Sequence, residues 1–116
     1  MDEITVARCL EQLKQRREVV LRTLQHLENE LRQVDENNDW LDYAAYETRV
    51  ALLTELTDGY LKESQEIDRA LTRIAQEHYG VCIACHRPIE AQRLETFPEV
   101  EYCAGCKAMR EDFAEA

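Results

Sequence analysis

Two apolar seams that mirror each other about position 40 constrain the fold of this chain most strongly. In each seam, core-type residues recur at steps of three and four, which places them on one face of a helix. Arg17 fills the one gap in the first seam, opposite Ser64. Either the two form a polar layer that fixes the register of the helices, or Arg17 turns its charge toward solvent, which is the expectation we favour. The first seam contains Val6, Leu10, Leu13, Val20, Leu24, Leu27, Leu31 and Val34, and the second contains Tyr46, Val50, Leu53, Thr57, Tyr60, Ser64, Ile67, Leu71 and Ile74.

The spacing of the two seams predicts an antiparallel coiled-coil hairpin. Val34 lies as far before position 40 as Tyr46 lies after it, and Leu27 and Leu53 are related in the same way. One long helix whose seams pair between two chains is the alternative. The run 35–39 disfavours it, because Asp and Asn there favour turns and helix starts. At about 1.5 Å per residue, helices of roughly 30 to 35 residues give an arm roughly 45 to 50 Å long.

Glycine and proline mark a change of structure near residue 80. Gly59 is the only one of these residues before that point, whereas Gly80, Pro88, Pro98 and Gly105 follow it. We therefore expect residues 1–78 to form the hairpin, with its tip near 35–44, and residues 79–116 to form a small separate domain that ends in a short helix. The predicted fold is mainly α.

The net charge of −10 argues against DNA as a direct partner, because binding to a nucleic-acid backbone needs clustered lysine and arginine. A protein partner is the better expectation. The N-terminal residues lack the basic and apolar regions of a signal peptide, and no apolar run approaches the roughly 20 residues of a membrane span. These features predict a cytoplasmic protein, whose paired cysteines are metal ligands more often than disulfides.

Two Cys-x-x-Cys units, separated by 17 residues, predict a site for one structural zinc ion. Four thiolates complete a tetrahedron and leave no open position for water or substrate, so we expect no enzyme activity. The surrounding core is too small to fold alone, and zinc should supply much of its folding free energy. The expected ligands are Cys82, Cys85, Cys103 and Cys106, and the expected core is Ile89, Leu94, Phe97, Val100 and Tyr102.

Three further residues with metal-binding side chains are not expected to bind the ion. His78 and His86 lie beside the cysteine pairs and are interpreted as surface residues, and Cys9 lies alone on the first helix. The sequence therefore assigns the site to four cysteines, and the role of Cys9 stays open.

The predicted tip is acidic and carries exposed apolar groups. Asp39 is a suitable N-cap for the second helix, and Asp42 in its first turn would be favoured by the helix dipole, so helix stability alone could explain both. That explanation leaves out Trp40, which has little core to receive it at the end of an arm. An exposed tryptophan beside charge often marks an interface, so a partner-binding tip is the competing hypothesis.

Taken together, these motifs resemble the DksA/TraR family of bacterial transcription factors over about residues 30 to 110. The combination is far more specific than the cysteines alone. The matching residues are Asp39-x-x-Asp42-x-Ala44, Ala70-Leu71-x-Arg73-Ile74, Tyr79-Gly80-x-Cys82-x-x-Cys85, Ile89, Arg93-Leu94-Glu95, Pro98 and Cys103-x-x-Cys106.

The resemblance implies a partner and a mode of action. Members of this family bind RNA polymerase rather than DNA, insert the coiled coil through the secondary channel, and place the acidic tip near the catalytic centre. By resemblance, Asp39, Asp42 and Ala44 are expected to alter transcription initiation. The residues alone leave a second hypothesis open, a zinc-stabilised coiled-coil adaptor that binds another protein through its flank.

The chain departs from the family pattern where longer members bind the alarmone guanosine tetraphosphate. Phe97 stands where those members offer a basic residue, and Glu66 stands where a lysine is expected, although Lys107 is retained. An aromatic ring and a carboxylate cannot donate charge-assisted hydrogen bonds to a polyphosphate. We therefore expect a weak or absent alarmone response. We also expect the protein to be without the additional N-terminal helical segment of longer members and to be a monomer.

Overall fold

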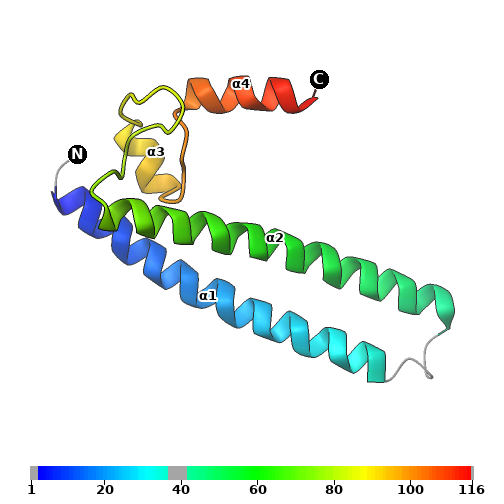
Figure 1. Ribbon diagram of the computed structural model, residues 1–116. Helices are drawn as coiled ribbons and strands as arrows, with labels where there is room; N and C mark the ends of the chain where they lie inside the picture. The colour runs from blue at the N-terminus through cyan, green and yellow to red at the C-terminus, as the bar shows by residue number, and fades with distance from the viewer. Residues whose placement is uncertain (1–2, 37–41, 116) are drawn as a thin grey trace. The chain divides into compact units, whose positions relative to one another are not determined.

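The computed structural model describes residues 3–36 and 42–115, with side chains as far as Glu111. These residues form four helices, and their only β pairing is an isolated bridge between Val81 and Pro88, so the predicted mainly α fold is confirmed (Figure 1). No helix in these segments is both long and apolar enough to cross a membrane. The helices are α1 (Glu3–Glu36), α2 (Tyr43–Ala75), α3 (Ala91–Thr96) and α4 (Ala104–Glu115).

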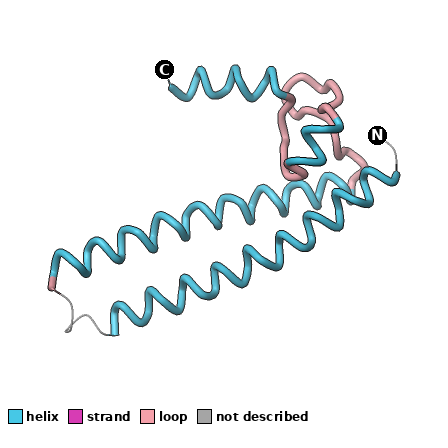
Figure 2. The backbone as a smooth tube through the Cα atoms, turned by 180° about the vertical axis from the view of Figure 1, so that it is seen from behind, coloured by secondary structure: helices cyan, strands magenta, loops and turns pink. Residues whose placement is uncertain are grey.

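Helices α1 and α2 run antiparallel and pair within one chain (Figure 2). Arg16 of α1 forms a bidentate ion pair with Glu63 of α2, and Glu30 of α1 pairs with Arg49 of α2 at 3.3 Å. Both contacts agree with the mirror register to within one residue. The hairpin was therefore predicted correctly, and the alternative of seams that pair between chains was wrong.

Most of the buried residues of the two long helices belong to the predicted seams, and Cys9 and Ala70 are buried in addition. Leu13, Val20 and Leu27 of α1 and Leu53 and Ile67 of α2 are at most 6% exposed. Each fully buried side chain of this kind contributes roughly 1.5 to 3 kcal/mol. Arg17, at the gap in the seam, is exposed, as expected.

Contacts divide the chain into two compact units. Residues 16–65 form one, here called the hairpin unit, and residues 1–15 together with 66–116 form the other, here called the cysteine unit. The start of α1 and the end of α2 therefore belong to the same unit as the cysteines. Composition predicts a boundary near residue 78, shortly after α2 ends at Ala75, whereas the contacts divide the chain within α1 and within α2.

Helix α2 ends in a Schellman motif that turns the chain into the cysteine-rich segment. His78 N–H donates to the carbonyl of Arg73 at 2.8 Å, and Glu77 N–H donates to that of Ile74 at 3.1 Å. This pattern requires a left-handed residue just after the helix, and Glu77 supplies it with φ of 62°. A non-glycine residue in this conformation is strained, because its Cβ approaches the following carbonyl.

The core of the cysteine unit joins both ends of the chain. Cys9 from α1 and Ile89, Leu94 and Tyr79 from the cysteine-rich segment are all at most 8% exposed, and the Tyr79 hydroxyl donates to the Pro98 carbonyl at 2.8 Å. Burial, followed by contact with Cys9, raises the pKa of Tyr79, so this phenol stays neutral.

One predicted core residue is exposed. Phe97 is 54% exposed, whereas Ile89 and Leu94 are buried and Val100 and Tyr102 are partly buried. Helix α3 has only six residues and buries Leu94, and Phe97 follows its end as the C-cap residue. The Phe97 side chain therefore does not lie on the buried face of α3, and the prediction that it belongs to the core was wrong.

Candidate metal centre

A tight turn brings the first two cysteines to one side of the chain. Cys82 N–H donates to the Arg87 carbonyl at 2.9 Å, and His86 N–H donates back to the Cys82 carbonyl at 3.0 Å. The bridge between Val81 and Pro88 closes the base of the turn. His86 adopts φ of 63°, a left-handed conformation that reverses the chain just after Cys85.

The other two cysteines lie at the start of α4. Cys103 directly precedes this helix and its carbonyl accepts a hydrogen bond from Lys107 N–H at 3.0 Å, while Cys106 lies in the first turn. The residues around the start of α4 therefore supply two of the four clustered thiols.

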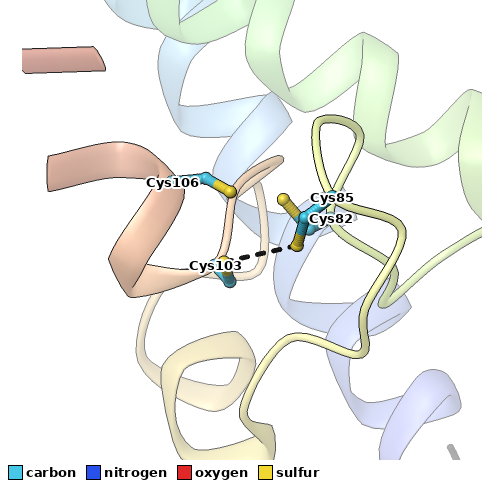
Figure 3. Close-up of side chains that lie close together, drawn as sticks. All are labelled: Cys82, Cys85, Cys103 and Cys106. Atoms are coloured by element: carbon cyan, nitrogen blue, oxygen red, sulfur yellow. Dashed lines mark hydrogen bonds between the residues drawn. The ribbon is translucent and has the colours of Figure 1, made fainter. Parts of the chain in front are cut away.

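The two pairs converge to form one four-sulfur cluster (Figure 3). A hydrogen bond from Ile83 N–H to the Glu101 carbonyl, 3.0 Å long, joins the turn to the segment that leads into Cys103. The four sulfur atoms all lie within 4.8 Å of one another, and Sγ of Cys85 is 3.8 Å from Sγ of Cys103. A tetrahedron with zinc–sulfur bonds of about 2.3 Å has edges of about 3.8 Å, so the cluster fits one zinc ion.

The pKa values of the thiols reflect this crowding. Burial of Cys82 disfavours its thiolate, but backbone N–H groups, that of Cys85 first, outweigh this effect and lower its pKa to about 6. Hydrogen bonding with the other three thiols, Cys103 first, raises the pKa of Cys106 to about 12. Four sulfur atoms this close share protons when no cation is bound, and a divalent cation replaces those protons.

With four sulfur ligands the site is closed, which makes the zinc structural, as the sequence predicted. His78 and His86 are both exposed and neither belongs to the cluster found among the described residues.

An ion-pair network holds the segment before Cys103 against the end of α2. The Glu101 carboxylate accepts a hydrogen bond from Nε of Arg69 and pairs with Arg73 at 3.3 Å, and both the Arg73 and Glu101 side chains are 13% exposed. This hydrogen bond raises the pKa of Arg69. Arg93 adds a bond from its Nε to the Tyr102 carbonyl at 3.2 Å. The metal site is thereby fixed to a long helix by charge-assisted contacts.

Cys9 is a residue whose position sequence reasoning missed. It is 1% exposed, and its thiol lies 3.8 Å from the Leu94 carbonyl, so it packs α1 against α3 within the cysteine unit. A signal was present, since Cys9 lies four residues before Leu13 and therefore on the same helix face. It lies outside the metal cluster.

At the tip, the structure describes two of the four predicted partner-binding residues. Asp42 precedes α2, and its Oδ1 accepts a hydrogen bond from Ala45 N–H at 2.8 Å, so Asp42 is the N-cap. The prediction that Asp42 lies in the first turn of this helix was wrong, because α2 begins only at Tyr43. Ala44 is exposed in the first turn. Asp39 and Trp40 lie outside the described residues.

A hydrogen bond links the two helices next to this cap. The Tyr46 hydroxyl donates to Oδ1 of Asp35 at 2.8 Å, and this bond raises the pKa of Tyr46. The last turn of α1 is thereby joined to the first turn of α2.

Comparisons with known proteins match both the cysteine segment and the whole chain. Residues 78–112 match the model of the prokaryotic dksA/traR C4-type zinc finger. Over 97 residues the chain is 31% identical to the RNA polymerase-binding transcription factors DksA of Escherichia coli and Salmonella typhimurium. This match covers 84% of the chain but only 62% of those relatives' length.

Two other matches cover a larger share of the protein to which the chain is compared. An uncharacterized protein of Aquifex aeolicus is 30% identical over 110 residues, which are 91% of this chain and 76% of that protein. The structure of transcription factor DksA2 from Pseudomonas aeruginosa superposes with a TM-score of 0.87 at 27% identity, covering all of this chain and 90% of that one.

Proposed function

The chain belongs to the DksA/TraR family of C4-type zinc-finger proteins, and from this premise we propose that it is a non-enzymatic transcription regulator that binds RNA polymerase. The observation that carries the proposal is the match of the whole chain to transcription factor DksA2. The name of the DksA relatives, RNA polymerase-binding transcription factor, supports the choice of partner. Cytoplasmic localisation follows from that partner. The proposed regulator acts as a monomer and binds no specific DNA sequence.

The proposed mode of action is insertion of the hairpin through the secondary channel, with the tip close to the catalytic centre. Asp39, Trp40, Asp42 and Ala44 are the proposed contacts. The charge distribution supports this mode, because a chain of net charge −10 is poorly suited to bind a DNA backbone. Asp42 and Ala44 are both exposed, so their side chains are available to a partner.

Replacing Asp42 tests the tip. Asn caps a helix about as well as Asp, so Asp42→Asn removes the charge while the bond to Ala45 N–H and the fold are retained. We expect the variant to bind core RNA polymerase in a pull-down as the parent chain does, and to lose regulation of a ribosomal promoter in a transcription assay.

Asp58→Asn is the matched control, because Asp58 is an exposed carboxylate on α2, outside the tip, and the charge change is identical. Equal regulation by the parent chain and the Asp42→Asn protein would refute the role of the tip. Failure of the parent chain to bind polymerase would refute the proposed function itself and would favour the adaptor hypothesis.

We also propose that guanosine tetraphosphate has little effect on this protein. Phe97 and Glu66 offer no positive charge, and the Arg93 guanidinium already donates to the Tyr102 carbonyl. In a transcription assay, adding the alarmone should change the regulated output no more than it does without the protein. Strong synergy between the two would contradict this prediction.

A further inference from the structure

One flank of α2 in the hairpin unit carries an open groove of about 550 Å³. Leu52 and Leu56 line it and remain 49% and 43% exposed. They follow each other at a spacing of four residues, so they lie one above the other on the same face of the helix. This face lies beside the seam and is not covered by α1 at these positions.

Gly59 also lines the groove and has no role in the packing of the chain itself. A Cβ built at this position would meet no atom within 4 Å, and its φ does not fall in the left-handed region. Glycine within a helix lowers stability relative to alanine, so the fold alone gives no reason for it. The missing side chain leaves a notch beside the two leucines, into which a partner's side chain or backbone can approach closely.

The charged groups of the groove are unequally paired. Glu63 receives two hydrogen bonds from Arg16, one of them 2.9 Å long, and is thereby neutralised. Glu55 also lines the groove, is exposed, and has no hydrogen bond or ion pair with any residue that the structure describes. A ligand that buries the leucines therefore meets one carboxylate that needs a cation.

We infer that this groove docks an amphipathic α-helix of a partner protein, with leucine-like side chains on one face and lysine or arginine beside them. Such a helix would place its apolar ridge between Leu52 and Leu56, approach closely at Gly59, and pair its cation with Glu55. The net charge of −10 opposes a second copy of this chain or an anionic membrane as the occupant. This inference goes beyond the proposed function.

The test uses the zinc-loaded full chain and a fluorescent synthetic helix of about 18 residues with a leucine face flanked by lysines. A second peptide keeps the leucine face and has glutamates in place of the lysines. We expect the lysine peptide to bind in an anisotropy titration and the glutamate peptide to bind at least about tenfold more weakly. Because the assay contains no polymerase, its outcome is independent of that of the proposed function.

Matched variants separate docking from general attraction. Leu56→Ser should weaken binding about tenfold. Leu61→Ser should not, because Leu61 is equally exposed, at 46%, but lies outside the groove, about 140° further round the helix. Glu55→Lys should also weaken binding. Glu47→Lys should not, although it changes the net charge equally, because Glu47 is exposed outside the groove.

Gly59→Met separates binding from folding. Methionine is a better helix former than glycine, so this variant should melt at a higher temperature and yet bind the lysine peptide more weakly. The inference is overturned if the parent chain does not bind that peptide, if Gly59→Met binds it as the parent does, or if groove and control variants lose affinity equally. The inference is also overturned if sedimentation shows that the parent chain self-associates and that Leu56→Ser does not, because the occupant of the groove would then be a second copy of this chain.

Discussion

Five cysteines of this chain occupy two chemically different environments. Four of them present their sulfur atoms to one another within 4.8 Å, while Cys9 is buried and directs its thiol at a backbone carbonyl. A buried thiol in an apolar core acts as a small hydrophobic group, whereas clustered thiols bind a soft cation. Residue type alone therefore does not separate the two roles, but the Cys-x-x-Cys spacing does.

The hydrogen bond between Tyr46 and Asp35 makes the tip sensitive to high pH. It raises the pKa of Tyr46 above its usual value of 10.0, so the stabilisation is fully present below that pH and is lost as the pH rises through the raised value. Asp35→Ala should return the pKa of Tyr46 toward 10.0, as measured by NMR with labelled tyrosine.

Tyr43 is the internal control for this measurement, because it lies three residues away on the same helix and is 75% exposed. Unchanged titration of Tyr46 after the substitution would show that the two side chains do not interact in solution.

At the scale of helices, local periodicity was enough to predict α1, α2, their register and the cysteine cluster. Both patterns depend only on spacing along the chain, and every seam position outside the Arg17 gap is buried or partly buried. The errors concern residues whose surroundings come from elsewhere in the chain. Phe97 was wrongly placed in the core and Asp42 in the first turn of α2, and the burial of Cys9 against Leu94 depends on residues 85 positions apart. The partner-binding role of the tip stays a prediction.

The end of α2 offers a stabilising substitution. Glu77 occupies the left-handed position of the Schellman motif, where glycine carries no Cβ penalty. Glu77→Gly should therefore raise the free energy of unfolding by about 1 kcal/mol, measured by reversible denaturation of the zinc-loaded chain.

Gly80→Ala is the contrasting variant. Gly80 is buried with φ of 88°, so a side chain there is strained and should lower stability. If Glu77→Gly destabilised the protein instead, a side-chain contribution of Glu77 would outweigh the backbone strain inferred here.

At the scale of the whole molecule, zinc should control the cysteine unit and leave the hairpin unit folded. The hairpin unit has its own apolar seam, including Val20, Leu27 and Leu53, and contains none of the four clustered cysteines, all of which lie in the cysteine unit. Structural zinc sites contribute about 10 to 16 kcal/mol of apparent binding free energy. After chelation, amides of residues 79–110 should lose protection in hydrogen exchange while those around Leu53 keep it.

Two serine variants control for effects of the chelator itself. Cys103→Ser should reproduce the loss of protection without chelator, because three ligands hold zinc less tightly than four. Cys9→Ser should keep one zinc ion per chain, although a hydroxyl at this buried position lowers stability. Unchanged exchange and melting after zinc extraction would show that the metal is dispensable for the fold.

The discontinuous cysteine unit also affects the order in which the protein can fold during synthesis. Its first residues, 1–15, leave the ribosome before the hairpin unit, but their packing partners, beginning at residue 66, leave after it. The hairpin unit can therefore fold first, while the apolar side chains of residues 1–15 remain exposed to solvent. Metal loading after Cys106 has emerged is then the event that completes the molecule.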